Sequence, residues 1–121
     1  MATLEAKDFS SPAETRPFAS KGKVEIINVG GLAVGRAVFE PGWKWSEHVK
    51  PIAKTDSCQT AHAAYVLSGR MNIVMDDGTQ QEIGPGQVMV AGPGHDAWTV
   101  GDEDCVIVDF GASIGQYAKQ G

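Results

Sequence analysis

Residues 62–69, HAAYVLSG, place an imidazole on a short apolar run that ends in a glycine turn. Such a run is typical of a β-strand, and the glycine at its end is typical of a tight connection to the next strand. Burying an unpaired polar group is costly, so a histidine on an apolar strand needs a partner. We therefore expect His62 to belong to a site inside a β-structure.

The same strand-and-turn pattern continues on both sides of this stretch. Asp77-Gly78 favours a tight hairpin, and glycine-proline-glycine corners stand at 84–86 and 92–94. No ten-residue stretch before Ser113 has helical spacing. Strands are predicted over 24–29, 32–40, 43–48, 62–68, 70–75, 79–83, 87–91, 95–100 and 105–110. Many short strands with regular turns predict an all-β, single-domain jelly-roll β-barrel.

The length of 121 residues is enough for one domain with one core. Residues 1–20 contain two prolines and no sustained period, so we interpret them as an N-terminal arm. The barrel is expected over 21–112. Residues 113–121 are expected to be a C-terminal tail, either a short helix or a frayed end.

The net charge of −5 and the lack of a basic cluster argue against binding to nucleic acid or to an anionic membrane. No run reaches the roughly 18 apolar residues that cross a bilayer, and the polar start is unlike a secretory signal. Two cysteines, Cys58 and Cys105, are too few for a disulfide scaffold, although a single bridge between them is an alternative. These features predict a cytoplasmic protein with reduced thiols.

The chain has three histidines, His48, His62 and His95, and each stands at or beside the end of a predicted strand. This arrangement is the pattern of a metal site built inside a small β-barrel. If residues 43–48 form a strand, alternation places Trp43 and Trp45 on one face and His48 on the other.

The residues from 42 to 69 resemble the first motif of the cupin family, G-x5-H-x-H-x3,4-E-x6-G. Gly42 and His48 match its opening, and His62 and Gly69 match its end. Lys50 stands where the family has its second histidine. His62 stands at the glutamate position, and about eight extra residues that include Cys58 separate the two halves.

The residues from 86 to 95 are similar to the second cupin motif, G-x5-P-x-G-x2-H-x3-N, shortened by two residues before the histidine. Gly86 and His95 match, whereas Gly92 replaces the usual proline and Thr99 the usual asparagine. The resemblance covers about 70 residues and implies a cupin jelly roll. Cupins commonly pair, so it also implies a homodimer.

Carried over residue by residue, the resemblance implies that His48, His62 and His95 hold a divalent transition metal ion. Cys58 is a further candidate ligand, because it lies four residues before His62 and shares its face if the strand starts early. Neutral imidazoles bind zinc, iron, nickel, manganese and copper, so the ligands do not name the metal. Three protein ligands leave a position open for water or substrate.

Our first hypothesis is a metal-dependent enzyme, an oxygenase, isomerase or lyase, that acts on a small organic molecule. The alternative is a non-catalytic module that senses a small molecule or a metal. A metal-free, epimerase-like site would need a histidine paired with a tyrosine or aspartate, and Tyr65 lies on the wrong face for it. The residues proposed to line a substrate pocket are Trp43, Trp45, Lys50 and Trp98.

Overall fold

The structure is a computed structural model that describes residues 4–111 and 113–119. The strands in these residues are β1 (Glu14–Pro17), β2 (Gly22–Val29), β3 (Leu32–Phe39), β4 (His62–Ser68), β5 (Arg70–Met75), β6 (Gln80–Ile83), β7 (Val88–Ala91), β8 (His95–Val100) and β9 (Cys105–Asp109). The helical segments are α1 (Trp45–His48), α2 (Lys50–Ala53) and the 3-10 turn η1 (Ile114–Gln116). No helix in the described part of the chain is long and apolar enough to cross a bilayer.

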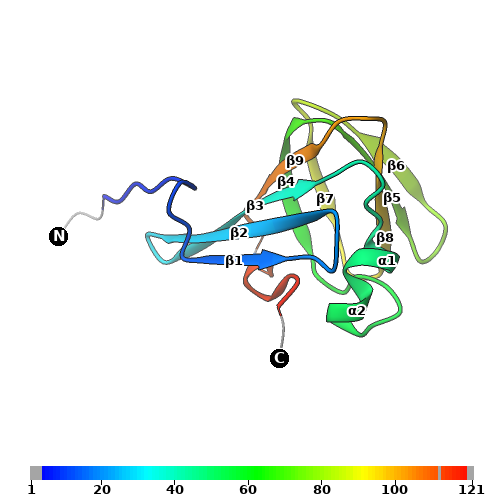
Figure 1. Ribbon diagram of the computed structural model, residues 1–121, viewed down its shortest axis with the longest axis horizontal. Coiled ribbons are helices and arrows are strands. Elements are labelled where there is room, and N and C mark those ends of the chain that lie inside the picture. Colours follow the sequence, from blue (N-terminus) through cyan, green and yellow to red (C-terminus); the bar gives the residue numbers. More distant parts are fainter. Residues whose placement is uncertain (1–3, 112, 120–121) are drawn as a thin grey trace.

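The strands form two antiparallel sheets that enclose one core (Figure 1). The larger sheet has the order β1-β2-β3-β9-β4-β7, and the smaller has the order β6-β5-β8. Consecutive strands β4 and β5 belong to different sheets, and so do β7 and β8. Chain crossings of this kind roll the two sheets around a shared interior, which confirms the predicted all-β jelly-roll barrel.

Strand β4 lies near the middle of the chain and is paired on both edges, with β9 on one side and β7 on the other. Its side chains alternate as predicted: His62, Ala64 and Val66 are buried, whereas Tyr65 and Leu67 are exposed. The alternation points His62 into the barrel, and the two partner strands supply its neighbours.

The region 43–48 differs from its prediction as a strand, because residues 45–48 form the single helical turn α1. The carbonyl of Lys44 accepts hydrogen bonds from the backbone N–H groups of Glu47 and His48. Trp45 and Val49, one helical turn apart, are both buried. A helical turn buries Trp45 and Val49 together, because residues four positions apart lie on one face of a helix. His48 therefore does not have the orientation that a strand would give it.

Described segments near both ends of the chain pack against the barrel, and the second contains the short 3-10 turn η1, one of the two forms expected for residues 113–121. Strand β1 pairs with β2, and the following Phe18 is buried among the core aromatics. The guanidinium of Arg16 donates hydrogen bonds to the carbonyls of Gly115 and Tyr117, at 2.9 Å each. Arg16 lies about a hundred positions before Gly115 and Tyr117 in the sequence. Arg16 thus fixes the C-terminal segment against the barrel.

Candidate metal centre

Three side chains with metal-binding atoms meet inside one end of the barrel. Cys58 precedes β4, His62 is the first residue of β4, and His95 is the first residue of β8. One ligand atom from each lies within 4.8 Å of the other two. All three side chains are buried, in an environment that strengthens electrostatic interactions.

Backbone pairing fixes Cys58 beside His95. The N–H of Cys58 donates to the carbonyl of His95 at 2.7 Å, and the N–H groups of Gly94 and His95 donate to the carbonyl of Cys58 at 2.7 and 3.2 Å. This short antiparallel bridge lies outside the named strands. It brings a loop cysteine to the start of β8 without depending on side-chain contacts.

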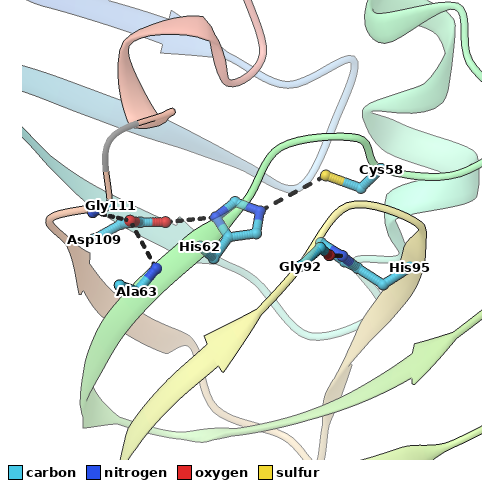
Figure 2. Close-up of polar contacts among 7 residues, drawn as sticks. All are labelled: Cys58, His62, Ala63, Gly92, His95, Asp109 and Gly111. Atoms are coloured by element: carbon cyan, nitrogen blue, oxygen red, sulfur yellow. Dashed lines mark hydrogen bonds and ion pairs between the residues drawn. The ribbon is translucent and has the colours of Figure 1, made fainter.

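A buried carboxylate orients His62. Asp109, the last residue of β9, is 1% exposed, and its Oδ2 lies 2.5 Å from Nδ1 of His62. The other oxygen, Oδ1, accepts hydrogen bonds from the N–H groups of Gly111 at 2.9 Å and Ala63 at 3.4 Å. With Nδ1 bonded to the carboxylate, Nε2 of His62 is directed at Cys58 Sγ, 3.6 Å away (Figure 2).

His95 is oriented in the same way by a backbone acceptor. Its Nδ1–H donates to the carbonyl of Gly92 at 2.8 Å, so Nε2 carries the lone pair. The rings of His62 and His95 are 5.2 Å apart and inclined by 63°. Metal-binding histidines usually donate their second ring N–H to a carboxylate or carbonyl, and both rings here do so.

The negative charge of a Cys58 thiolate and the positive charge of a protonated His62 stabilise each other. Burial alone would raise the pKa of the Cys58 thiol, but its interactions with the rings of His62 and His95 outweigh burial and lower that pKa to about 6. Burial alone would lower the pKa of His62, yet Asp109 and Cys58 raise it to about 9. At neutral pH and without a metal, the two therefore form a thiolate–imidazolium pair.

The second cysteine has the opposite character. Burial and the nearby Glu103 raise the pKa of Cys105 to about 12, which keeps that thiol neutral. Cys58 and Cys105 are both free, so the structure contains no bridge between them. Only Cys58 has the environment of a reactive or metal-binding sulfur.

The spacing of these atoms fits a tetrahedral ion. At the tetrahedral angle, zinc–sulfur bonds of about 2.3 Å and zinc–nitrogen bonds of about 2.0 Å place the two ligand atoms about 3.5 Å apart. Cys58 Sγ and His62 Nε2 are 3.6 Å apart. The donor set therefore fits a divalent transition metal in its chemistry, and the Cys58–His62 distance matches tetrahedral spacing.

A surface pocket of about 190 Å³ reaches this group from outside. Cys58 lines it together with residues of α2, of the loop before β4 and of the C-terminal segment. The lining residues with polar side-chain groups are Thr55, Gln59, Thr60, Gln116, Tyr117 and Lys119. A small organic molecule in this pocket would contact the sulfur side of the centre.

The structure brings together Cys58, His62 and His95 but leaves His48 outside this group. In α1, the ring Nδ1 of His48 accepts a hydrogen bond from the N–H of Lys44 at 3.0 Å. Of the four candidate ligands, the structure therefore groups Cys58, His62 and His95 and leaves out His48. The reason is the helical turn, which replaces the strand that the motif match presupposed.

The residues proposed to line a pocket are divided among several places. Trp43 and Trp45 line a small internal cavity that also touches His62 and His95. Trp98 lines a surface pocket that Trp43 also lines, and the ammonium of Lys44 lies 5.6 Å from the ring centroid of Trp98. Lys50 lies in α2, 4.0 Å from the exposed carboxylate of Asp56.

Sequence reasoning missed Asp109 and Tyr117. Asp109 ends the apolar run 105–109 and shares inward parity with Cys105 and Ile107, so alternation along this strand could have revealed a buried carboxylate. Tyr117 packs edge-on against His62, with ring centroids 5.1 Å apart. It lies in a segment with no periodic pattern, so its sequence carries no comparable signal.

No protein-family model matches this sequence, and no curated protein is found to be similar to it. Solved structures, however, share its architecture. An RmlC-like cupin from Shewanella frigidimarina superposes with a TM-score of 0.58 at 14% identity, over 88% of this chain and 91% of that one. A cupin-like protein from Thermotoga maritima gives 0.57 at 18% identity, over 90% and 81%.

The chain has the cupin fold. An oxalate decarboxylase from Lactobacillus farciminis superposes with a TM-score of 0.60 at 15% identity, where 90% of this chain matches 32% of that enzyme. This chain thus corresponds to about a third of the larger enzyme. At these identities the similarity establishes the cupin fold, and the chemistry must be argued from the residues of this chain.

Metal binding is expected to release about one proton per ion from the Cys58–His62 pair at pH 7.5. At that pH a pKa of about 6 leaves the Cys58 sulfur without a proton, whereas a pKa of about 9 leaves a proton on His62 Nε2 for the ion to displace. Between about pH 6 and 9 the affinity should rise about tenfold per pH unit. A pH indicator in weak buffer, read as zinc chloride is added, measures the release.

In the metal-free Asp109→Asn variant the proton should move from His62 to Cys58, because loss of the carboxylate lowers the pKa of His62 and removes the charge that stabilises the thiolate. The ultraviolet thiolate absorbance of metal-free protein at pH 7.5 should therefore fall relative to wild type. Release of two protons from wild type at pH 7.5, or equal thiolate absorbance in both proteins, would contradict the assigned charges.

Proposed function

We propose that this cupin-fold chain binds one divalent transition metal ion through Cys58 Sγ and the Nε2 atoms of His62 and His95. The observation that carries the proposal is the orientation of the imidazoles. Each has its Nδ1 bonded to a fixed acceptor, Asp109 or the Gly92 carbonyl, and its Nε2 left for a ligand. A thiolate with two imidazoles suits zinc, copper or iron better than magnesium or calcium, which prefer oxygen ligands.

We further propose, as the first of two candidate functions, that the chain is an enzyme that acts on a small organic molecule. Three protein ligands leave at least one coordination position free, as catalytic metal sites do. A bound ion would supply Lewis acidity, either to polarise a substrate oxygen or to activate water. The protein would supply the pocket of about 190 Å³, whose hydroxyl, amide and ammonium groups orient the substrate beside Cys58.

The pocket lining also supports the alternative, a binding module that senses a metal or a small ligand. Among the described residues that line the pocket, only Cys58, Tyr117 and Lys119 have titratable side chains. Cys58 serves as a ligand in our proposal, and burial raises the pKa of Tyr117 well above its usual value. A catalytic site usually contains a general acid or base close to neutrality, so the lack of a carboxylate or free imidazole there favours binding without turnover.

Metal analysis of single variants tests the proposed ligand set. Wild type, purified without chelator or affinity nickel, should bind about one zinc or cobalt ion per chain. The cobalt form should show thiolate-to-cobalt charge transfer in the near ultraviolet. Cys58→Ser should lose that band, and His62→Gln and His95→Gln should each weaken binding at least about tenfold.

Two matched variants serve as controls for this experiment. Cys105→Ser removes the other buried thiol, and His48→Gln removes the histidine outside the group. Both should keep the ion and the charge-transfer band. Loss of the band in Cys105→Ser, or its retention in Cys58→Ser, would refute the proposed site.

We also propose that two copies of the chain pair through the outer face of β4 and β7. Strand β7 is an edge of the larger sheet, and its Val88 and Val90 are 65% and 81% exposed. Tyr65 and Leu67, on the neighbouring β4, extend the same apolar surface. Apolar edge strands of this kind readily associate with another chain.

Sedimentation of wild type at micromolar concentration should give twice the 12.8 kDa chain mass. Val90→Lys should shift the protein to monomer, because a charge at the centre of the contact would be desolvated on pairing. Leu32→Lys changes an exposed leucine on β3 and should remain dimeric. A monomeric wild type, or a dimeric Val90→Lys, would exclude pairing through this face.

A further inference from the structure

Two buried hydrogen-bond donors stand beside the proposed metal position without a partner. Trp43 and Trp45 are each 2% exposed, and neither indole Nε1–H has an acceptor among the described residues. Leaving a buried donor unpaired is unfavourable, and two such donors on core residues two positions apart in the sequence are unusual. An acceptor that is not part of the described chain would satisfy them.

Both indole rings line one internal cavity of about 20 Å³. Space of this size holds a single water-sized group. His62, His95 and Tyr117 line the same cavity. The remaining lining is apolar and offers no side-chain oxygen or nitrogen as an acceptor: Phe39, Met71, Ile73, Met89, Ala97 and Ile107.

Different members of the metal-binding group line the cavity and the outer pocket. His62 and His95 line the inner cavity, whereas Cys58 lines the outer pocket. Trp45 and Tyr117 line both spaces. An ion bound by all three ligands would therefore have the small cavity on its imidazole side and the larger pocket on its sulfur side.

We propose that the inner cavity binds one water-sized hydrogen-bond acceptor, an oxygen atom or a halide, to which Trp43 and Trp45 donate their indole N–H groups. This inference rests on the proposed metal site, because the ion would supply the positive charge that favours such an acceptor over an empty apolar cavity. The metal centre then has two compartments, the inner cavity and the outer pocket. Organic molecules occupy the outer pocket, and the inner cavity admits only a ligand of about one non-hydrogen atom.

Fluoride is the probe that matches this cavity, since it is a single atom and a strong acceptor. Fluoride added to the cobalt-loaded protein should change the visible absorption of the ion, and the titration gives its affinity. Trp43→Phe and Trp45→Phe should each weaken that affinity about five- to tenfold, as expected for one lost hydrogen bond. Trp98→Phe is the matched control, since Trp98 does not line the inner cavity, and it should match wild type within about twofold.

Replacing tryptophan by benzothienylalanine in the Trp98→Phe background removes both N–H groups and nearly preserves the shape of each side chain. This protein keeps the experiment decisive if a phenylalanine variant fails to fold, and its fluoride affinity should fall further than that of either single variant. Unchanged fluoride affinity with cobalt still bound at one ion per chain would overturn the inference and leave the metal site standing. Failure of wild type to bind cobalt would overturn both.

Discussion

The hydrogen bond between Asp109 on β9 and His62 on β4 is the interaction on which the rest of the site depends. It places a carboxylate in the barrel interior, where an unpaired charge would be strongly unfavourable. Its second oxygen is satisfied by two backbone N–H groups, so the carboxylate is held from both sides. This bond fixes the His62 tautomer and raises its pKa, and the resulting charge stabilises the Cys58 thiolate.

The strand pairing of the jelly roll explains how residues far apart in the sequence meet at this bond. β4 lies between β9 and β7, so the carboxylate and the turn that leads to His95 approach it from opposite edges. The Cys58–His95 backbone bridge adds the sulfur from a loop. Arg16 holds the C-terminal segment in place, and Tyr117 of that segment packs against the imidazole of His62. The result is a buried polar group whose members are each fixed by a different part of the fold.

Much of the fold could be predicted from the sequence because alternation and turn chemistry are local. The buried face of β4 followed from alternation in residues 62–68, and Asp77-Gly78 marked a turn where Gly78 has a φ of 94°. The helical turn at 45–48 was missed because Trp43 and Trp45 alternate like strand residues, while the deciding partner, Val49, lies beyond them. The hydrogen bonds from Arg16 to the C-terminal segment and the role of Asp109 depend on contacts across the fold, which no local pattern specifies.

X-ray absorption at the zinc edge of the loaded protein tests the account most directly, because it counts the atoms bound to the ion. We expect the zinc ion to be bound by one sulfur at about 2.3 Å, by two imidazole nitrogens at about 2.0 Å and by one further light atom in the open position. A coordination shell without sulfur, or one with three imidazoles, would contradict it.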